Sequence, residues 1–455
     1  MLFALSRSTQ CARTGVIIVS AMTITGCVVG LNPAYRDEST ETSDETSGEG
    51  QHETGTDGSG DGDGDGDGDG DGDGDGDGDG DGDGDGDADG DGDGDGDDFD
   101  PKCNNGVIEP GEFCFEVVDL MQLDKIQSVT AGDFDGDGKM DIGVARENDI
   151  LVLFGAGNGT FPLALDLAEQ NGKYRGAGAG DLDHDLIDDL IVAHEDSHHI
   201  FVYISNGDGS FDDPVAHAAG SKPGDLALAL LDGDDALDLV TVSSDNEAVS
   251  LMLGDGLGGF APPLAQPGQK DPLRLDLAHF NADPWLDLAV ANRDDRSISI
   301  HLGSSDGAFE LAQIYHLNGR PWSVAIGDLD NDGDLDLAAP LDDADVVEVL
   351  YGDGFGGFVG PGASVTVGDK PVGAVTTDLD VDGQLDIVVI NADDKSVGIS
   401  FGDPDSPGQF LPYQTLANLG NLPNLAVILT ADFNDDGVGD LIVGGDGLWA
   451  MISTP

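Results

Sequence analysis

The chain has 455 residues, enough to bury a large hydrophobic core. It carries 92 Asp and Glu residues against 17 Lys and Arg residues, which gives a formal net charge of −75. So strong a negative charge disfavours DNA, RNA and anionic membrane surfaces as direct partners.

The first predicted element is a targeting segment. Two basic residues, Arg7 and Arg13, precede the apolar run GVIIVSAMTITG, which is short for a membrane span. The run ends in ITGC, residues 24–27, which resembles the lipobox of bacterial lipoproteins. The resemblance implies a signal peptide over 1–26, lipid attachment at Cys27 and, with Val28 next, an outer-membrane or cell-surface location. An ordinary secretory signal with a chance Cys is the alternative.

An acidic segment follows the targeting segment. Residues 36–102 hold 29 of the acidic side chains, and Asp-Gly repeats fill residues 61–97 with one interruption, at Ala88. Such a composition offers no core and repels itself. We therefore expect a disordered Asp/Gly-rich linker over 27–102, with a weak calcium store as the alternative function.

Two cysteines remain after the targeting segment and the lipid site are assigned. Cys103 and Cys114 frame CNNGVIEPGEFC, and an exported chain with two such residues favours a disulfide. The stretch resembles a Cys-Gly-Asn-Gly element of some myxobacterial surface proteins, although Asn104 and Phe113 depart from it. We expect a disulfide-closed segment over 103–114.

The remainder of the chain is built from seven repeats. Acidic nonapeptides such as DFDGDGKMD begin at residues 133, 181, 230, 279, 328, 378 and 432. A Gly-rich turn that ends in Phe recurs with the same period, for example FGAGNGTF and YGDGFGGF. A period of this length indicates a repeat architecture.

Each repeat predicts four short strands and no helix. An apolar strand enters the acidic loop, a second leaves it, a third runs into the Gly-rich turn, and a less regular fourth leads onward. Seven such units predict an all-β, seven-bladed β-propeller over 115–455. The last unit supplies only three strands, so we expect FEVVDLM at residues 115–121 to complete the last blade and remove both edges.

These repeats resemble the FG-GAP/VCBS family, whose known relatives include the seven-bladed head of integrin α-chains. The resemblance implies calcium-binding loops between the first and second strands, all on one face of the ring. It also implies binding functions, since related repeats occur in adhesion proteins and in lectins.

The acidic loop has the chemistry of a calcium site. Calcium takes six to eight hard oxygens, which alternating carboxylates supply where a Gly permits a sharp turn. In the first loop the expected ligands are Asp133, Asp135, Asp137, the Lys139 carbonyl and Asp141. The pattern resembles an EF-hand loop without its helices, and repetition in an exported chain favours a structural role for the ion.

Four further loops are predicted to bind calcium in the same way. Their expected ligands are Asp181, Asp183, Asp185 and Asp189; Asp328, Asp330, Asp332, Asp334 and Asp336; Asp378, Asp380, Asp382 and Asp386; and Asp432, Asn434, Asp436 and Asp440. The remaining two loops depart from the pattern, with Leu230 or His279 at position one and Pro284 at position six of the latter. We expect these two to hold metal poorly or not at all.

One segment matches a catalytic motif. His194-Glu195-Asp196-Ser197-His198 fits H-E-x-x-H, which binds catalytic zinc when both His share one face of a helix. Here the segment is predicted to be a turn between strands, so we expect no such zinc site. Trp285 is expected to pack where its loop has lost the metal, with a sugar platform as the alternative.

The sequence favours binding over catalysis. No nucleophile elbow, catalytic base or cofactor motif stands out, so we expect a non-enzymatic, monomeric propeller that binds an extracellular protein or polysaccharide. A lectin-like propeller is the first alternative, and a hydrolase or lyase is the second.

Basic residues are predicted to lie on one face. Of the 13 Lys and Arg residues after residue 114, all but Lys139 fall in links or turns expected on the face away from the acidic loops. We take Lys222, Arg320 and Lys370 as candidate contacts for an anionic ligand. The alternative is that these cations pair locally with acidic turn residues.

Overall fold

The computed structural model describes residues 114–167, 172–360, 362–419 and 426–454. The expected signal peptide, Cys27, the Asp/Gly-rich linker and Cys103 lie outside these ranges, whereas Cys114 is described and is disulfide-bonded. The described residues form 29 β-strands, and they contain no helix long and apolar enough to cross a bilayer.

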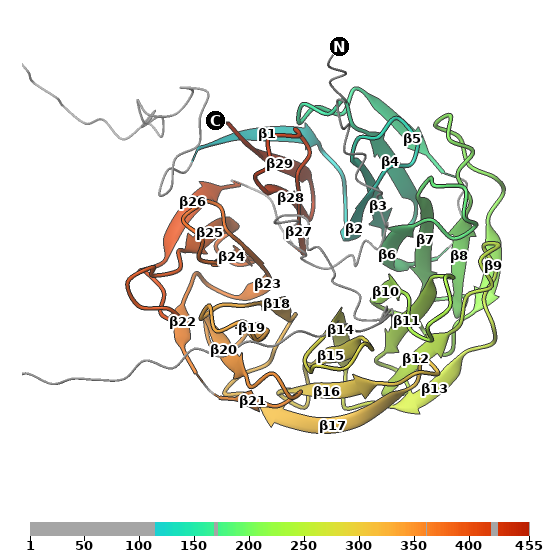
Figure 1. Ribbon diagram of the computed structural model, residues 1–455. Helices are drawn as coiled ribbons and strands as arrows, with labels where there is room; N and C mark the ends of the chain where they lie inside the picture. The colour runs from blue at the N-terminus through green and yellow to red at the C-terminus, as the bar shows by residue number, and fades with distance from the viewer. Residues whose placement is uncertain (1–113, 168–171, 361, 420–425, 455) are drawn as a thin grey trace, which may run out of the picture. The chain divides into compact units, whose positions relative to one another are not determined.

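The strands form seven antiparallel sheets that stand as blades around a central axis (Figure 1). Blade 1 contains β2 (Ile126–Gly132), β3 (Asp141–Arg146), β4 (Ile150–Phe154) and β5 (Leu163–Asp166). Blade 2 contains β6 (Tyr174–Gly180), β7 (Asp189–His194), β8 (His199–Tyr203) and β9 (Val215–Ala218). Blade 3 contains β10 (Leu226–Ala229), β11 (Asp238–Ser243), β12 (Ala248–Met252) and β13 (Leu264–Pro267).

The second half of the ring repeats this order. Blade 4 contains β14 (Pro272–Ala278), β15 (Asp287–Asn292), β16 (Ser297–Gly303) and β17 (Phe309–His316). Blade 5 contains β18 (Ala325–Gly327), β19 (Asp336–Leu341), β20 (Val346–Gly352) and two short outer strands, β21 (Phe358–Val359) and β22 (Ser364–Thr366). Blade 6 contains β23 (Pro371–Thr377), β24 (Asp386–Asn391), β25 (Ser396–Ser400) and β26 (Gln414–Asn418).

The predicted closure of the ring is confirmed in blade 7. This blade contains β27 (Val427–Ala431), β28 (Asp440–Gly444), β29 (Leu448–Ser453) and β1 (Phe115–Met121). The N-terminal strand β1 pairs antiparallel with the C-terminal strand β29, from Phe115 opposite Ser453 to Met121 opposite Leu448. Figure 1 shows strands β1 and β29 side by side in the ring. The edge of β29 is therefore covered, and β1 takes the outer position that the fourth strand has in the other blades.

Burial differs between the four strands of a blade and is most complete in the second strand. Second strands such as β7, β15 and β24 are buried along their whole length, because neighbouring blades cover both of their faces. Their near-continuous apolar sequences are typical of strands buried on both sides. The outermost strands β5, β9 and β13 are mostly exposed, which explains their weaker sequence pattern.

The hydrophobic core lies between the blades. Seven buried clusters are found in the described chain, and one of them joins Leu429 and Ile442 of blade 7 to Val144 and Leu153 of blade 1. No blade buries its faces alone, so the ring is stable only when complete.

Removing the closing strand is expected to destabilise the ring. Deletion of residues 115–121 exposes the edge of β29 and the partly buried Val118 and Met121 that pack on the core. We predict a lower melting temperature and self-association through the open edge, measured by circular dichroism and size-exclusion chromatography. Deletion of residues 61–97 is the control, and it should leave melting unchanged. Equal melting of the two deletion variants would show that β1 does not close the fold.

Candidate metal centre

The seven acidic loops all connect the first strand of a blade to its second strand, as predicted. Because the strands are antiparallel, the Gly-rich turns after each third strand lie at the same end of the blades. We call this side of the ring the metal-loop face and the opposite side the far face. Residues of each loop are numbered here from position one to position nine.

Each loop is shaped by its own carboxylates. The position-one carboxylate accepts the N–H of position six, as in Asp133 with Gly138 at 2.9 Å and Asp328 with Gly333 at 3.0 Å. The carboxylate at position three accepts the N–H of position five, and position five accepts that of position seven. Position six adopts positive φ (84° at Gly138 and 95° at Gly333), which Gly reaches without strain.

Four of the five predicted sites bring three carboxylates together. Within the described residues, ligand oxygens lie within 4.8 Å of one another in four groups: Asp133, Asp135 and Asp141; Asp181, Asp183 and Asp189; Asp328, Asp330 and Asp332; and Asp378, Asp380 and Asp386. Such groups repel one another unless a cation lies between them.

One oxygen of the first loop specifically fits a cation. Asp133 Oδ1 is buried and has no hydrogen-bond donor among the described residues. A buried, unpaired carboxylate oxygen is costly, and a bound ion would satisfy it. The donor set of carboxylates and a position-seven carbonyl consists of hard oxygens, so the loop fits a hard divalent cation.

The position-nine aspartate also binds backbone N–H groups, a role that the ligand pattern in the sequence does not indicate. Asp141 accepts the N–H of Phe134 at 2.8 Å and the N–H of Gly155 at 2.7 Å, one on each oxygen. The carboxylate thereby joins the acidic loop to the Gly-rich turn of its own blade. The same pair of hydrogen bonds is made by the equivalent residues Asp189, Asp238, Asp287, Asp336, Asp386 and Asp440.

This arrangement explains the Gly that opens most of these turns. A Cβ atom on Gly155 would lie 2.1 Å from the carbonyl oxygen of Met140, and one on Gly303 would lie 2.1 Å from that of Leu286. Only Gly lets the backbone come this close to the loop while its N–H reaches the aspartate. One feature of the sequence indicates this structural role: Asp is found at position nine of all seven loops, including the two that are not expected to bind metal.

Burial strongly perturbs the position-nine carboxyls. Loss of hydration raises their pKa values, although the two backbone N–H groups favour the charged form. The pKa reaches about 7 at Asp141, Asp189 and Asp336, about 8 at Asp386 and about 6 at Asp440. Neighbouring carboxylates such as Asp135 add to the rise at Asp141. A cation in the loop would favour the charged form.

The two altered loops keep their shape by other means. In blade 3 the position-nine bonds of Asp238 remain, although Leu230 supplies no carboxylate at position one. In blade 4 the Nδ1 atom of His279 lies 3.0 Å from the backbone carbonyl oxygen of Trp285. That carbonyl occupies position seven, so the imidazole N–H holds the oxygen that a metal would otherwise use.

In the last loop, side-chain hydrogen bonds partly replace the contacts that an ion would make with the carboxylates. The side-chain amide of Asn434 donates to Asp436 at 2.9 Å, and the Ser453 hydroxyl donates to the same carboxylate at 2.6 Å. Metal binding by this loop stays a prediction, as it does for the other four.

The H-E-x-x-H segment is a hairpin turn between β7 and β8, as expected, so its histidines do not share a helix. His194 is buried against Tyr174 and Phe201, and His198 Nδ1 accepts the N–H of Lys222 at 2.9 Å. Glu195 pairs with Arg175 at 2.6 Å.

The candidate cationic contacts on the far face form ion pairs. Lys222 pairs with Asp245 at 3.0 Å, Arg320 with Asp342 at 3.0 Å, and Lys370 with Asp393 at 3.4 Å. Local pairing was the alternative interpretation of these cations. Their role in ligand binding stays a prediction.

A family model described as an FG-GAP-like repeat matches residues 133–192 and 279–339. The chain carries FG-GAP-like repeats. Each match begins at an acidic loop and ends within the second strand of the next blade, so an FG-GAP-like repeat is offset from a structural blade. The strand order establishes that the repeats close into a seven-bladed β-propeller.

Two solved structures support the fold. BBS1N in complex with ARL6DN, soaked with mercury, is 13% identical with a TM-score of 0.52, and the match covers 76% of this chain and 97% of that one. The lead-soaked form is 14% identical with the same TM-score, and the match covers 75% and 97% of the two chains. A lectin of Agrocybe aegerita that recognises non-reducing terminal N-acetylglucosamine is 19% identical, with a TM-score of 0.45 and coverage of 74% and 87%. No curated protein sequence matches the chain.

The two kinds of aspartate in FG-GAP-like repeats can be separated by substitution. Asp328→Asn at position one should weaken the stabilisation by calcium. It should lower the metal-free melting temperature less than Asp238→Asn does, because the two backbone N–H groups that Asp328 accepts, those of Asp332 and Gly333, are exposed to water. Asp238→Asn, in a loop without the position-one ligand, should lower stability by about 1–3 kcal/mol with or without calcium, because the amide NH₂ then faces a backbone N–H. Thermal melting with calcium and with chelator measures both. Equal effects of the two substitutions would contradict the distinction.

Proposed function

We propose that the protein is an extracellular, calcium-stabilised β-propeller that binds a partner outside the cell. The observation that carries the proposal is the presence of four clusters on the metal-loop face, each of which brings three aspartate carboxylates together. Lys139 is the only Lys or Arg within the seven acidic loops, and it pairs with Asp137 at 3.0 Å. The remaining carboxylates have no such counterion within their own loops, and a hard cation would supply it.

Calcium is the cation that best fits these loops. The donors are carboxylates and a backbone carbonyl, and alternate positions along a tight loop accommodate a large, flexible coordination shell. The loops also hold the ring together. The Gly-rich turn of one blade donates a backbone N–H to the acidic loop of the preceding blade, as Gly258 does to Leu182 at 2.9 Å and Gly356 does to Phe280 at 2.7 Å. Calcium in one loop would therefore stiffen the contact with the next blade.

The location of the protein is part of the same proposal. The ITGC sequence at residues 24–27 supports attachment through a lipid at Cys27, and the acidic segment that follows supports a spacer between membrane and propeller. This arrangement would place the propeller at the bacterial outer membrane or cell surface.

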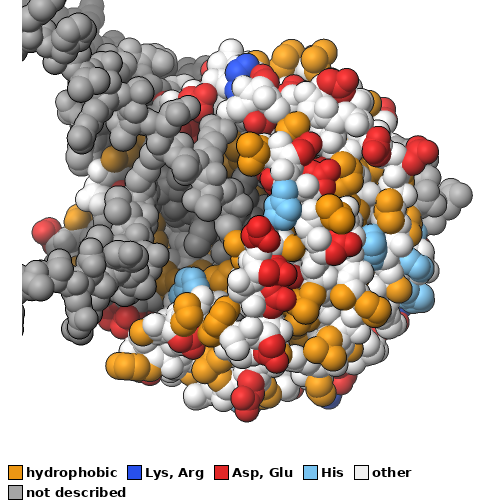
Figure 2. Space-filling model, turned by 45° about the vertical axis from the view of Figure 1, so that its right-hand side comes forward, with side chains coloured by type: hydrophobic (Ala, Val, Ile, Leu, Met, Phe, Trp, Pro, Cys, Tyr) orange, Lys and Arg blue, Asp and Glu red, His pale blue; other side chains and the backbone are white. Residues whose placement is uncertain are grey.

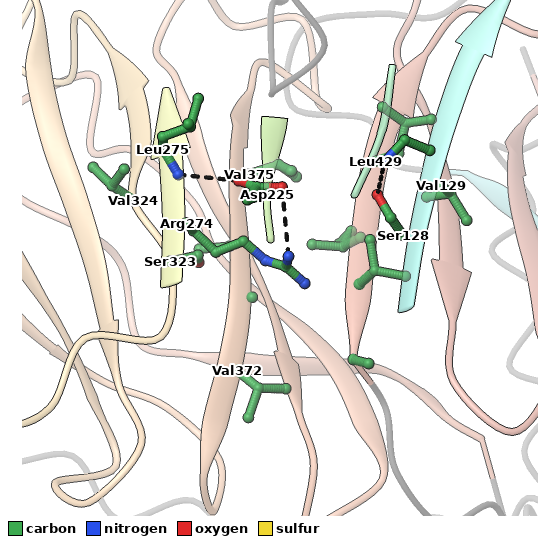
Figure 3. A pocket seen from close by; sticks show the side chains of 16 residues that line it. Ser128, Val129, Asp225, Arg274, Leu275, Ser323, Val324, Val372, Val375 and Leu429 are labelled. Carbon is green, nitrogen blue, oxygen red and sulfur yellow. Dashed lines mark hydrogen bonds and ion pairs between the residues drawn. The ribbon is translucent and has the colours of Figure 1, made fainter. Parts of the chain in front are cut away.

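A binding role is favoured over catalysis by the central channel. A cavity on the axis is lined by residues from all seven blades, mostly apolar ones such as Val129, Val375 and Leu429 (Figure 3). Its charged residues are Arg274 and Asp225, which pair with each other at 3.4 Å. Among the described lining residues the hydroxyl groups belong to Ser128 and Ser323, and the Asp225 carboxylate is paired with Arg274, so we propose that ligands bind on the outer surfaces.

Calcium should raise the melting temperature of the full chain by several degrees, and a chelator should reverse the rise. The metal-free protein should become less stable as the pH rises from about 5 to about 8. The reason is that its position-nine carboxyls have pKa values raised from 3.8 to about 7, so the folded state binds more protons than the unfolded state in this window. Calcium should therefore stabilise most at pH 8. A melting temperature that is the same with and without calcium at every pH would overturn the proposal.

A second prediction concerns an anionic ligand on the far face. The triple change Lys222→Gln, Arg320→Gln and Lys370→Gln should weaken binding to an acidic polysaccharide such as alginate and leave the calcium-dependent melting unchanged. Lys139→Gln, on the metal-loop face, is the matched control. Because each of the three cations already pairs with an aspartate, the ligand must compete with that pair. Unaltered binding by the triple variant would show that the far face is not the site.

A further inference from the structure

Large apolar side chains are exposed on the metal-loop face of blades 2 to 5. Leu186 is 88% exposed, Leu257 is 79% exposed and Phe355 is 84% exposed, and these are the three most exposed large hydrophobic side chains in the described chain. Trp285, in the acidic loop of blade 4, is half-buried. We call these four residues the apolar band.

Two members of the band stand where other blades carry polar residues. Leu257 and Phe355 occupy the same position of the Gly-rich turn, between its second and third Gly. The equivalent residues of blades 1, 2 and 4 are Asn158, Asp208 and Asp306. The turn therefore accepts a polar residue here, and its own folding does not explain a bulky apolar one.

Leu186 stands where Gly is the rule. It occupies position six with a φ of 74°, whereas four other loops carry Gly at this position. A leucine in this conformation costs about 1–2 kcal/mol, and its exposure means that little burial offsets the cost. The backbone strain at Leu186 is not offset by contacts of its side chain within the protein, which favours a contact with another molecule.

The band runs across neighbouring blades. Leu257 follows Gly256, where an added Cβ atom would lie 2.6 Å from His184 Nε2, and His184 belongs to the loop that carries Leu186. The ring of Trp285 reaches the loop of blade 3, 3.2 Å from where a Cβ atom on Gly233 would lie. Phe355 forms a β-bridge with Asn281 in the loop of blade 4. The loops and turns that carry the four apolar side chains thus contact one another from blade 2 to blade 5.

The surroundings of the band carry one sign of charge. The acidic loops and Gly-rich turns of blades 2 to 5 contain no Lys or Arg. Asp235, Asp255, Asp283 and Asp353 are all exposed there, and none of them belongs to the five loops predicted to bind calcium. Figure 2 shows acidic and hydrophobic side chains interspersed on the visible surface, with few Lys or Arg residues among them. This surface would attract cations and would repel nucleic acids, anionic lipids and a second copy of the same face.

We propose that the apolar band is a docking surface for a protein partner whose contact segment is both cationic and amphipathic. The leucines, Trp285 and Phe355 supply the apolar anchors, and the surrounding aspartates select lysine or arginine on either side of the partner's apolar residues. The surface lies on the opposite side of the ring from Lys222, Arg320 and Lys370, so it would serve a different partner from an anionic ligand on the far face.

The test uses the full chain in calcium and a synthetic amphipathic peptide of leucine and lysine. Calorimetric titration should give saturable binding, and the triple change Leu186→Gly, Leu257→Asn and Phe355→Asn should weaken it at least about tenfold. Each substitution introduces a residue that the chain itself uses at the equivalent position of another blade. The matched control is Leu264→Asn with Val359→Asn, at apolar residues 56% and 68% exposed on the outer strands, and it should bind as the wild type does.

Two further peptides and one variant separate the contributions of charge and of apolar contacts to binding. A peptide of glutamate and leucine in the same pattern should not bind, and one of lysine and serine should bind at least about tenfold more weakly. Leu186→Gly alone should weaken binding without lowering the melting temperature, because Gly relieves the strain.

Several outcomes would overturn the proposal. Equal binding of the lysine–serine peptide would mean that the surface only attracts charge. Unchanged affinity of the triple variant would mean that the band takes no part. Self-association of the wild type that the triple variant abolishes, measured by sedimentation, would identify a second copy of the chain as the occupant.

Discussion

The hydrogen bonds of one carboxylate are the constraint on which the rest of this propeller depends. In blades 1 to 6 the position-nine aspartate enters the second strand and ties the acidic loop to the turn that follows the third strand. In blade 7 it ties the loop to Ser453 at the end of β29. Two loops that would otherwise be independent therefore share one rigid base. The aspartate is retained in blades 3 and 4, which have lost the position-one carboxylate, so its primary role is to hold backbone rather than metal.

That role has an electrostatic cost. The carboxylate is buried, and its environment favours the protonated form close to neutral pH. A cation nearby would offset the cost, which gives a physical reason for acidic residues to gather at the same end of the blade. In blade 4, which has no carboxylate at position one, the His279 imidazole contacts the Trp285 carbonyl oxygen and would take the place of such a cation.

The sequence predicts the fold almost completely because repetition averages out local ambiguity. Seven loops with one spacing identify the blades, and the missing strand of the last repeat identifies the closure by β1. The geometry within the loops is harder to predict. The Asp pattern looks like a ligand set alone, and the spacing does not show that the carboxylate at position nine accepts hydrogen bonds from two backbone N–H groups. The sequence left local pairing of the far-face cations open as an alternative, but it did not identify the partner of Arg320. Asp342 is brought beside it within blade 5, where Pro321 and Leu341 form a β-bridge.

The pairing of β1 with β29 also has a mechanical consequence. Any tension that reaches the propeller through the chain before residue 114 enters the fold at Phe115, the first residue of the closing strand. The ladder between β1 and β29 therefore lies at the point where the load is applied. Tension along the strand axis would load its hydrogen bonds together in shear, whereas tension across the strand would open them one at a time from the Phe115–Ser453 pair. The resistance of the ring to pulling thus depends on the direction of the load.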